Sequence, residues 1–78
     1  MTETQLRLYP GFENLPVYDE SDPRSYEIAF GYQQQVRECS LLQDVESCLA
    51  DPKLIPLGGV RVGDNGQQVV IAFFGARG

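Results

Sequence analysis

The sequence predicts an α+β fold. We expect a small antiparallel sheet of three to four strands, one short helix over about residues 40–50 packed on one face, and an extended N-terminal arm over residues 1–24. Three observations carry this prediction: prolines interrupt the first 24 residues, residues 40–52 have helical spacing, and two apolar runs flank an Asn-Gly turn. Residues 25–78 are therefore expected to form a single β-α-β-β domain.

The N-terminal arm has little room for regular structure, because Pro10, Pro16 and Pro23 interrupt it. The stretch "TQLRLYP" predicts a brief strand with Leu6 and Leu8 on one side. The arm also contains too many apolar residues for a free tail. We expect it to wrap around the domain or to reach onto a neighbouring subunit.

Residues 26–36 allow two interpretations. Apolar side chains recur there at every second position: Tyr26, Ile28, Phe30 and Tyr32. A period of two with aromatic and β-branched members favours a strand. The alternative is a helix capped by Asp22 with Pro23 at its first position, which Gly31 would weaken.

The clearest helix covers residues 40–50. Ser40 is the expected N-cap, Gln43 would complete a capping box, and Pro52 ends the helix. One apolar stripe follows the helical period: Leu41, Leu42, Val45, Cys48 and Leu49. A helix of this length does not persist alone in water, so it must pack on the sheet.

Asn65-Gly66 predicts a type I′ turn between the last two strands, with Val62 opposite Val69 and Val60 opposite Ile71. One face then carries Val60, Val62, Val69, Ile71 and Phe73, and the other carries Arg61, Gln68, Val70, Ala72 and Phe74. We assign the first face to the core under the helix. The apolar part of the second face then needs a cover, which is the arm, a second subunit or a target. Gly58-Gly59 predicts a bulge or a close backbone approach at the start of this hairpin.

The order of strand, short helix, "PLGGVRV", polar turn and "QQVVIAFF" resembles a small uncharacterised family of bacterial and phage proteins built as strand-helix-strand-strand. Pro56, Gly58, Gly59 and Val60 match the Pro-x-Gly-Gly and β-branched residue that begin the hairpin in that family. Lys53-Leu54 stand where the family has Gly-Trp. The resemblance covers about residues 26–75 and implies a fold rather than a function.

The two cysteines, Cys39 and Cys48, are nine positions apart. If Cys39 directly precedes the helix, a rise of ~1.5 Å per residue places the two about 12 Å apart, beyond disulfide reach. We expect free thiols that fill the core in a reducing compartment. The chain has no histidine, and we expect no catalytic residue, metal site or cofactor.

The formal net charge is −5, from six Lys and Arg against eleven Asp and Glu. Residues 1–22 hold five acids against Arg7, a net −4, and the remaining residues hold six acids against five cations, a net −1. Direct nucleic-acid binding is not expected, because it needs clustered Lys and Arg. Neither a membrane span nor a signal peptide is apparent, so we expect a cytoplasmic protein without membrane contact.

The sequence therefore predicts a non-enzymatic protein-interaction module, such as a small acidic inhibitor or accessory factor of the phage or mobile-element type. It is expected to form a homodimer or larger oligomer through Val70, Ala72 and Phe74. A basic protein target is expected to contact Glu13, Asp19, Glu20 and Asp22. The alternative is an oligomeric binder of an anionic metabolite or nucleotide, with a cleft lined by Tyr32, Arg61, Phe74 and Arg77.

Overall fold

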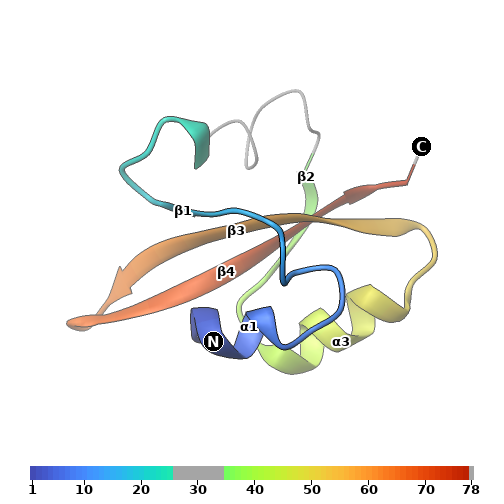
Figure 1. The fold of residues 1–78 in the computed structure, drawn as a ribbon, viewed down its shortest axis with the longest axis horizontal. Coiled ribbons are helices and arrows are strands. Elements are labelled where there is room, and N and C mark those ends of the chain that lie inside the picture. Colours follow the sequence, from blue (N-terminus) through green and yellow to red (C-terminus); the bar gives the residue numbers. More distant parts are fainter. Residues whose placement is uncertain (26–34, 78) are drawn as a thin grey trace.

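The structure is a computed structural model that describes residues 1–25 and 35–77. Its elements in chain order are α1 (Glu3–Arg7), β1 (Val17–Asp19), β2 (Gln35–Cys39), α3 (Leu42–Ala50), β3 (Leu54–Asp64) and β4 (Gln67–Ala76). The strands form one sheet in the order β1-β3-β4-β2, with β1 parallel to β3 and the other pairs antiparallel (Figure 1). The predicted α+β fold is confirmed. The arm adds a parallel strand, so the sheet is mixed.

The β3–β4 hairpin has the predicted register. Val62 lies opposite Val69 and Val60 opposite Ile71. Asn65 and Gly66 both have positive φ, at 50° and 81°, as a type I′ turn requires. The turn residues therefore determine the pairing from Asp64 and Gln67 at the turn to Gly58 and Phe73, where a bulge shifts the register.

The predicted bulge and close approach at the two glycines are both present. The β3–β4 register shifts between Pro56 and Gly58, and Gly58 has a φ of 148°. A Cβ atom on Gly59 would lie 3.0 Å from Cγ1 of Val70 and 3.2 Å from the carbonyl oxygen of Ile71. Gly59 is therefore required by the close approach of Val70 and Ile71 on the neighbouring strand, with Leu6 of α1 next to them.

α3 begins one residue later than expected. Leu41 is its N-cap and makes no side-chain capping hydrogen bond, so the predicted capping box of Ser40 and Gln43 is wrong. The helix ends before Pro52, as predicted, with Asp51 as its C-cap. The start of the helix thus lacks the polar side chain that usually satisfies its first N–H groups.

The first residues of the arm form a short helix, so the predicted strand there is wrong. Thr2 and Gln5 form a capping box: the Thr2 hydroxyl accepts from the Gln5 backbone N–H at 3.1 Å, and Gln5 Oε1 accepts from the Thr2 N–H at 2.9 Å. Leu6 is completely buried and Leu8 is 81% exposed. The two leucines therefore point to opposite sides of one helical turn.

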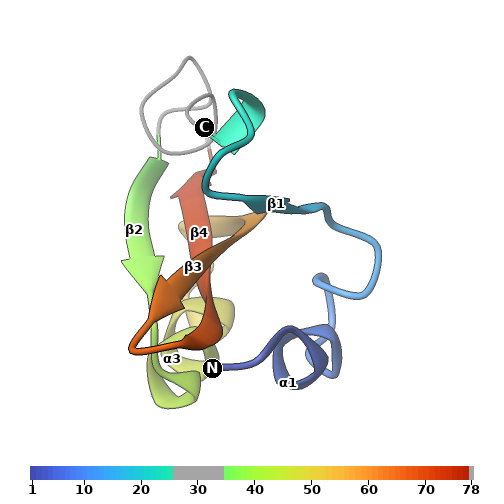
Figure 2. The same ribbon diagram turned by 90° about the vertical axis from the view of Figure 1, so that its left-hand side faces the viewer.

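Both helices cover the same face of the sheet (Figures 1 and 2). The main core lies beneath them and contains Leu6, Phe12, Cys39, Val45, Cys48, Val70, Ala72 and Phe74. The assignment of the two hairpin faces is therefore wrong, because the face of Val70, Ala72 and Phe74 is the one under α3. Small residues explain why the helices cover this face of the sheet. Gly59 lies opposite Ala72, and this pair leaves room for the side chain of Leu6.

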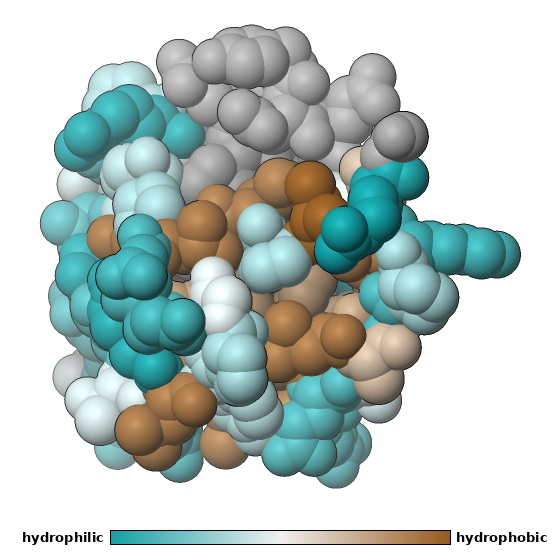
Figure 3. All heavy atoms as spheres, turned by 45° about the vertical axis from the view of Figure 1, so that its right-hand side comes forward, coloured by the Kyte–Doolittle hydropathy of each residue, from teal (hydrophilic) through white to brown (hydrophobic). Residues whose placement is uncertain are grey.

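The other face of the sheet has a smaller cluster. Val60 and Phe73 are buried there, with partly buried side chains around them: Tyr18, Leu57, Val62 and Ile71. Leu54 and Ile55 at the start of β3 are half-buried, and Leu54 packs against the main core. Figure 3 shows apolar atoms at the surface between hydrophilic regions. The strand or helix expected over residues 26–36 lies outside the described residues, except for its last two, which begin β2.

The two cysteines are much closer than expected. Their Sγ atoms are 3.4 Å apart, and both thiols are free. The estimate of about 12 Å assumed that Cys39 continues the axis of the helix. Cys39 instead ends β2, the chain reverses before α3, and the helix packs back against the strand. Cys48 therefore lies directly over Cys39.

Candidate functional site

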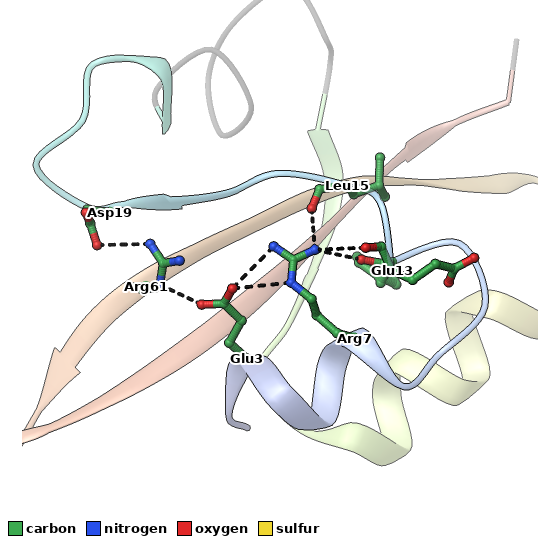
Figure 4. Close-up of polar contacts among 7 residues, drawn as sticks. Glu3, Arg7, Glu13, Leu15, Asp19 and Arg61 are labelled. Atoms are coloured by element: carbon green, nitrogen blue, oxygen red, sulfur yellow. Dashed lines mark hydrogen bonds and ion pairs between the residues drawn. The ribbon is translucent and has the colours of Figure 1, made fainter.

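Arg61 lies between two carboxylates and joins three elements (Figure 4). Its Nε donates to Oε1 of Glu3 on α1 at 2.7 Å, and its Nη1 donates to Oδ1 of Asp19 on β1 at 3.3 Å. The hydrogen bond from Arg61 holds the pKa of Glu3 below its usual value of 4.5. These contacts fasten the N-terminal segment to β3.

Arg7 closes the loop that follows α1. Its Nη1 donates to the carbonyl oxygens of Phe12 at 3.1 Å and Leu15 at 2.8 Å, and its guanidinium also pairs with Glu3 (Figure 4). The same guanidinium thus satisfies backbone carbonyls and an acid on its own helix. Arg7 and Arg61 are therefore engaged within the chain.

The structure does not assemble the expected ligand cleft. Arg61 is held by its two carboxylates, and Phe74 is completely buried in the main core, where it offers no surface to a ligand. Arg77 is exposed, and its backbone N–H donates to the carbonyl of Lys53 at 2.8 Å. Tyr32 lies outside the described residues. No geometry among the described residues favours an anionic small ligand at this set.

The four acids expected to contact a basic partner have different surroundings. Asp19 pairs with Arg61, and Asp22 pairs with Arg24 at 2.6 Å, which lowers the pKa of Asp22. Glu13 is exposed and accepts a hydrogen bond from the Gly11 N–H at 3.0 Å. Glu20 is exposed at the end of β1. Two of the four acids therefore already pair with an arginine of this chain.

The expected self-association residues are in the interior. Val70 is 3% exposed, and Ala72 and Phe74 are 0% exposed. The N-terminal segment and α3 cover them, and Phe12 packs directly on Phe74. The assignment of these three residues to a surface between subunits is wrong, because their cover comes from the same chain.

Strand β2 has five residues and is the longer of the two edge strands in the described sheet, and exposed apolar side chains lie near both of its ends. Val36, where the pairing with β4 is irregular, and Leu41, two residues beyond the strand, are each 54% exposed. Among the described residues the only other exposed large apolar side chain is Leu8, at 81%. Apolar side chains beside an unpaired strand edge are typical of a surface that pairs with another chain.

A hollow of about 330 Å³ adjoins the exposed leucine at the start of α3. It is lined by Met1, Ser40, Leu41, Leu42 and Gln43. The N-terminal ammonium of Met1 donates to the carbonyl oxygen of Ser40 at 3.1 Å, between two of these lining residues. We call Val36, the outer edge of β2 and this hollow the β2 edge surface.

The sequence contains a signal for this surface that the interpretation above missed. Leu41 and Leu42 were placed in one apolar stripe. Adjacent residues of a helix point about 100° apart, so a narrow stripe cannot bury both. One leucine of such a pair is therefore a candidate for surface contact, and here it is Leu41.

The charge around the β2 edge surface is negative. β2 and α3 carry Glu38, Asp44 and Glu46 against Arg37, and the N-terminal ammonium of Met1 lines the hollow, so the formal net is −1. Glu46 accepts a hydrogen bond from the Tyr9 hydroxyl at 2.6 Å, whereas Glu38 is exposed on the edge strand. A partner that follows this edge therefore meets an acidic surface.

Within the described ranges, no group of three or more His, Cys, Asp and Glu side chains could hold a metal ion. No helix there is long and apolar enough to cross a membrane. Comparison of the chain with protein-family models, curated proteins and solved structures finds no match. The resemblance to a strand-helix-strand-strand family stays a prediction, although β2, α3, β3 and β4 have that order.

Proposed function

We propose that this chain is a non-enzymatic protein-interaction module that binds an extended, basic segment of another protein along the β2 edge surface. The observation that carries the proposal is the exposure of Val36 and Leu41 at the two ends of the edge strand. A module of this kind suits an inhibitor or accessory factor, which acts by occupying a partner's surface.

The N-cap of α3 supports a binding role for Leu41. Ser, Thr, Asp or Asn at this position stabilises a helix by about 1 kcal/mol relative to an apolar residue. Leu41 forgoes that stabilisation and also exposes more than half of its side chain to water. A local rule broken in this way without a folding benefit is expected at functional positions.

The edge strand supports an extended segment as the partner. The inner side of β2 pairs with β4, and its outer side has no partner strand among the described residues. An added strand gains main-chain hydrogen bonds along such an edge and places alternate side chains on each face. The hollow beside Leu41 would accept one apolar side chain of that segment.

Charge supports a basic partner. The chain has a net charge of −5, and although Arg37 offsets Glu38 on the edge strand, Asp44 and Glu46 on the adjoining α3 leave an acidic excess. Complementary charge raises the rate of association and fixes the register of two chains more than it adds affinity. Lys or Arg flanking the apolar residue of the bound segment would match this surface.

A selection experiment tests the proposal. Peptides selected from a randomised library on the full chain should be basic, and they should shift the backbone amide resonances of β2 and residues 40–43 in NMR spectra. Glu38→Gln should weaken their binding severalfold, and this loss should shrink at high salt. Peptides that instead shift residues on β1 or the β3–β4 turn would overturn the proposal.

A further inference from the structure

Cys39 and Cys48 form a buried thiol pair that connects the edge strand to the helix. Cys39 is the last residue of β2 and Cys48 lies in α3, and their Sγ atoms are 3.4 Å apart. They are 1% and 2% exposed, and both are free thiols. The pair therefore sits inside the main core, in the layer between sheet and helix.

We propose that Cys39 and Cys48 are a redox modification site, at which a small-molecule disulfide such as oxidised glutathione converts the two thiols into one intramolecular disulfide. One thiolate attacks the small disulfide, which forms a mixed disulfide and releases one small thiol. The second thiolate then attacks the protein sulfur of the mixed disulfide and releases the other small thiol. Two protein thiols are oxidised, one small disulfide is reduced to two thiols, and the two protons leave with them.

The geometry favours an intramolecular bond. A disulfide needs its sulfur atoms about 2.05 Å apart, and the pair starts from van der Waals contact. The ring closed by this bond spans residues 39–48, which includes the reversal of the chain before α3. The bond would thus fix the helix on the edge strand by restricting the unfolded chain.

Burial makes the reduced state persistent. Desolvation, followed by the hydrogen bond with Cys48, raises the pKa of the Cys39 thiol to about 12. Few thiolates are therefore present at neutral pH, and the reagent must enter through local opening of the α3 layer. Oxidation is expected over hours rather than seconds.

The ring carries Ser40 to Gln43, which line the hollow of the β2 edge surface. Oxidation would therefore hold that part of the surface in place. The proposal that this disulfide forms does not depend on any binding role, because disulfide formation is measured on the chain alone.

The test exposes the folded full-length chain to excess oxidised glutathione and follows its intact mass after acid quenching and alkylation in guanidinium, where every remaining thiol is accessible. The wild type should lose the mass of two hydrogens, resist alkylation, stay free of intermolecular bonds and melt on the order of 10 °C higher than in reducing buffer. Cys39→Ala and Cys48→Ala should each show no redox-dependent change in melting temperature.

Two results would overturn the proposal. In the first, the folded wild type keeps both thiols alkylatable after incubation in a buffer that oxidises the guanidinium-unfolded chain. In the second, the disulfide forms but lowers the melting temperature, which would mean that the native packing rejects it. Neither result depends on partner binding, so the two proposals fail separately.

Discussion

The ring of Phe12 stands edge-on to the ring of Phe74, with centroids 5.5 Å apart and planes inclined by 75°. Phe12 comes from the loop after α1, and Phe74 comes from β4. Phe12 is 1% exposed and Phe74 is 0% exposed. The contact therefore makes the N-terminal segment part of the core, and the covered face of the sheet depends on it.

Phe12→Ala should lower the free energy of unfolding by about 3–5 kcal/mol, because it removes a fully buried ring and leaves a cavity over Phe74. Urea unfolding measures this change. Leu8→Ala is the control in the same segment, since Leu8 is 81% exposed, and it should change stability by less than about 0.5 kcal/mol. Equal effects of the two substitutions would show that the segment does not cover the sheet.

Phe74→Asp should unfold the chain instead of dissociating an oligomer. The substitution buries a carboxylate in an apolar layer without a partner, which is strongly destabilising. Circular dichroism and size-exclusion chromatography distinguish the outcomes. A folded variant that runs as a smaller assembly than the wild type would restore Phe74 to a subunit interface.

Gly59→Ala should be destabilising by about 1–3 kcal/mol, because the new Cβ would lie 3.0 Å from Cγ1 of Val70 and the backbone would have to shift. Gly63→Ala in the same strand is the matched control, since nothing lies within 4 Å of its added Cβ. Its effect should stay under about 1 kcal/mol. Similar losses from both variants would argue against the close approach of β4 to Gly59.

Acid should weaken the fold partly through Glu3. The pKa of Glu3 is lowered in the folded state, chiefly by the hydrogen bond from Arg61. Its contribution is therefore present above the unfolded value near 4.5 and is lost as the pH falls through the lower folded value. Arg61→Met should flatten the fall in stability between about pH 5 and pH 3 relative to wild type.

Arg77→Met is the control for this profile, since the Arg77 side chain is exposed and makes no ion pair with the described residues. Its unfolding free energy should follow the wild-type curve. Parallel profiles for Arg61→Met and wild type would mean that Arg61 does not hold Glu3 in its charged form.

Local signals in the sequence determine the hairpin well. Asn65 and Gly66 specify the turn, and the period-two pattern then gives the correct pairing from Asp64 opposite Gln67 back to the bulge beside Gly58. The same pattern cannot say which face a helix covers, because both faces are partly apolar. The face is decided by the pair of small residues Gly59 and Ala72. This pair makes room for a covering side chain, and that side chain is Leu6 of α1.

Long-range contacts account for the other differences. The thiols of Cys39 and Cys48 meet because the chain reverses between strand and helix, and residue spacing alone does not contain that reversal. We predicted Arg61 at a ligand cleft. Its guanidinium instead pairs with Glu3, which is 58 positions away in the chain. Leu41 was expected in the core, and its exposure follows from a helix start that is one residue later.

The most direct test of the β2 edge surface is the Leu41→Ser variant, measured for both stability and peptide binding. A serine N-cap should raise the free energy of unfolding by about 0.5–1 kcal/mol, while affinity for a wild-type-selected peptide should fall at least tenfold. Leu8→Ser, an equally polar change at another exposed leucine, should leave affinity unchanged. Unchanged affinity in a stabilised Leu41→Ser would contradict the proposed surface.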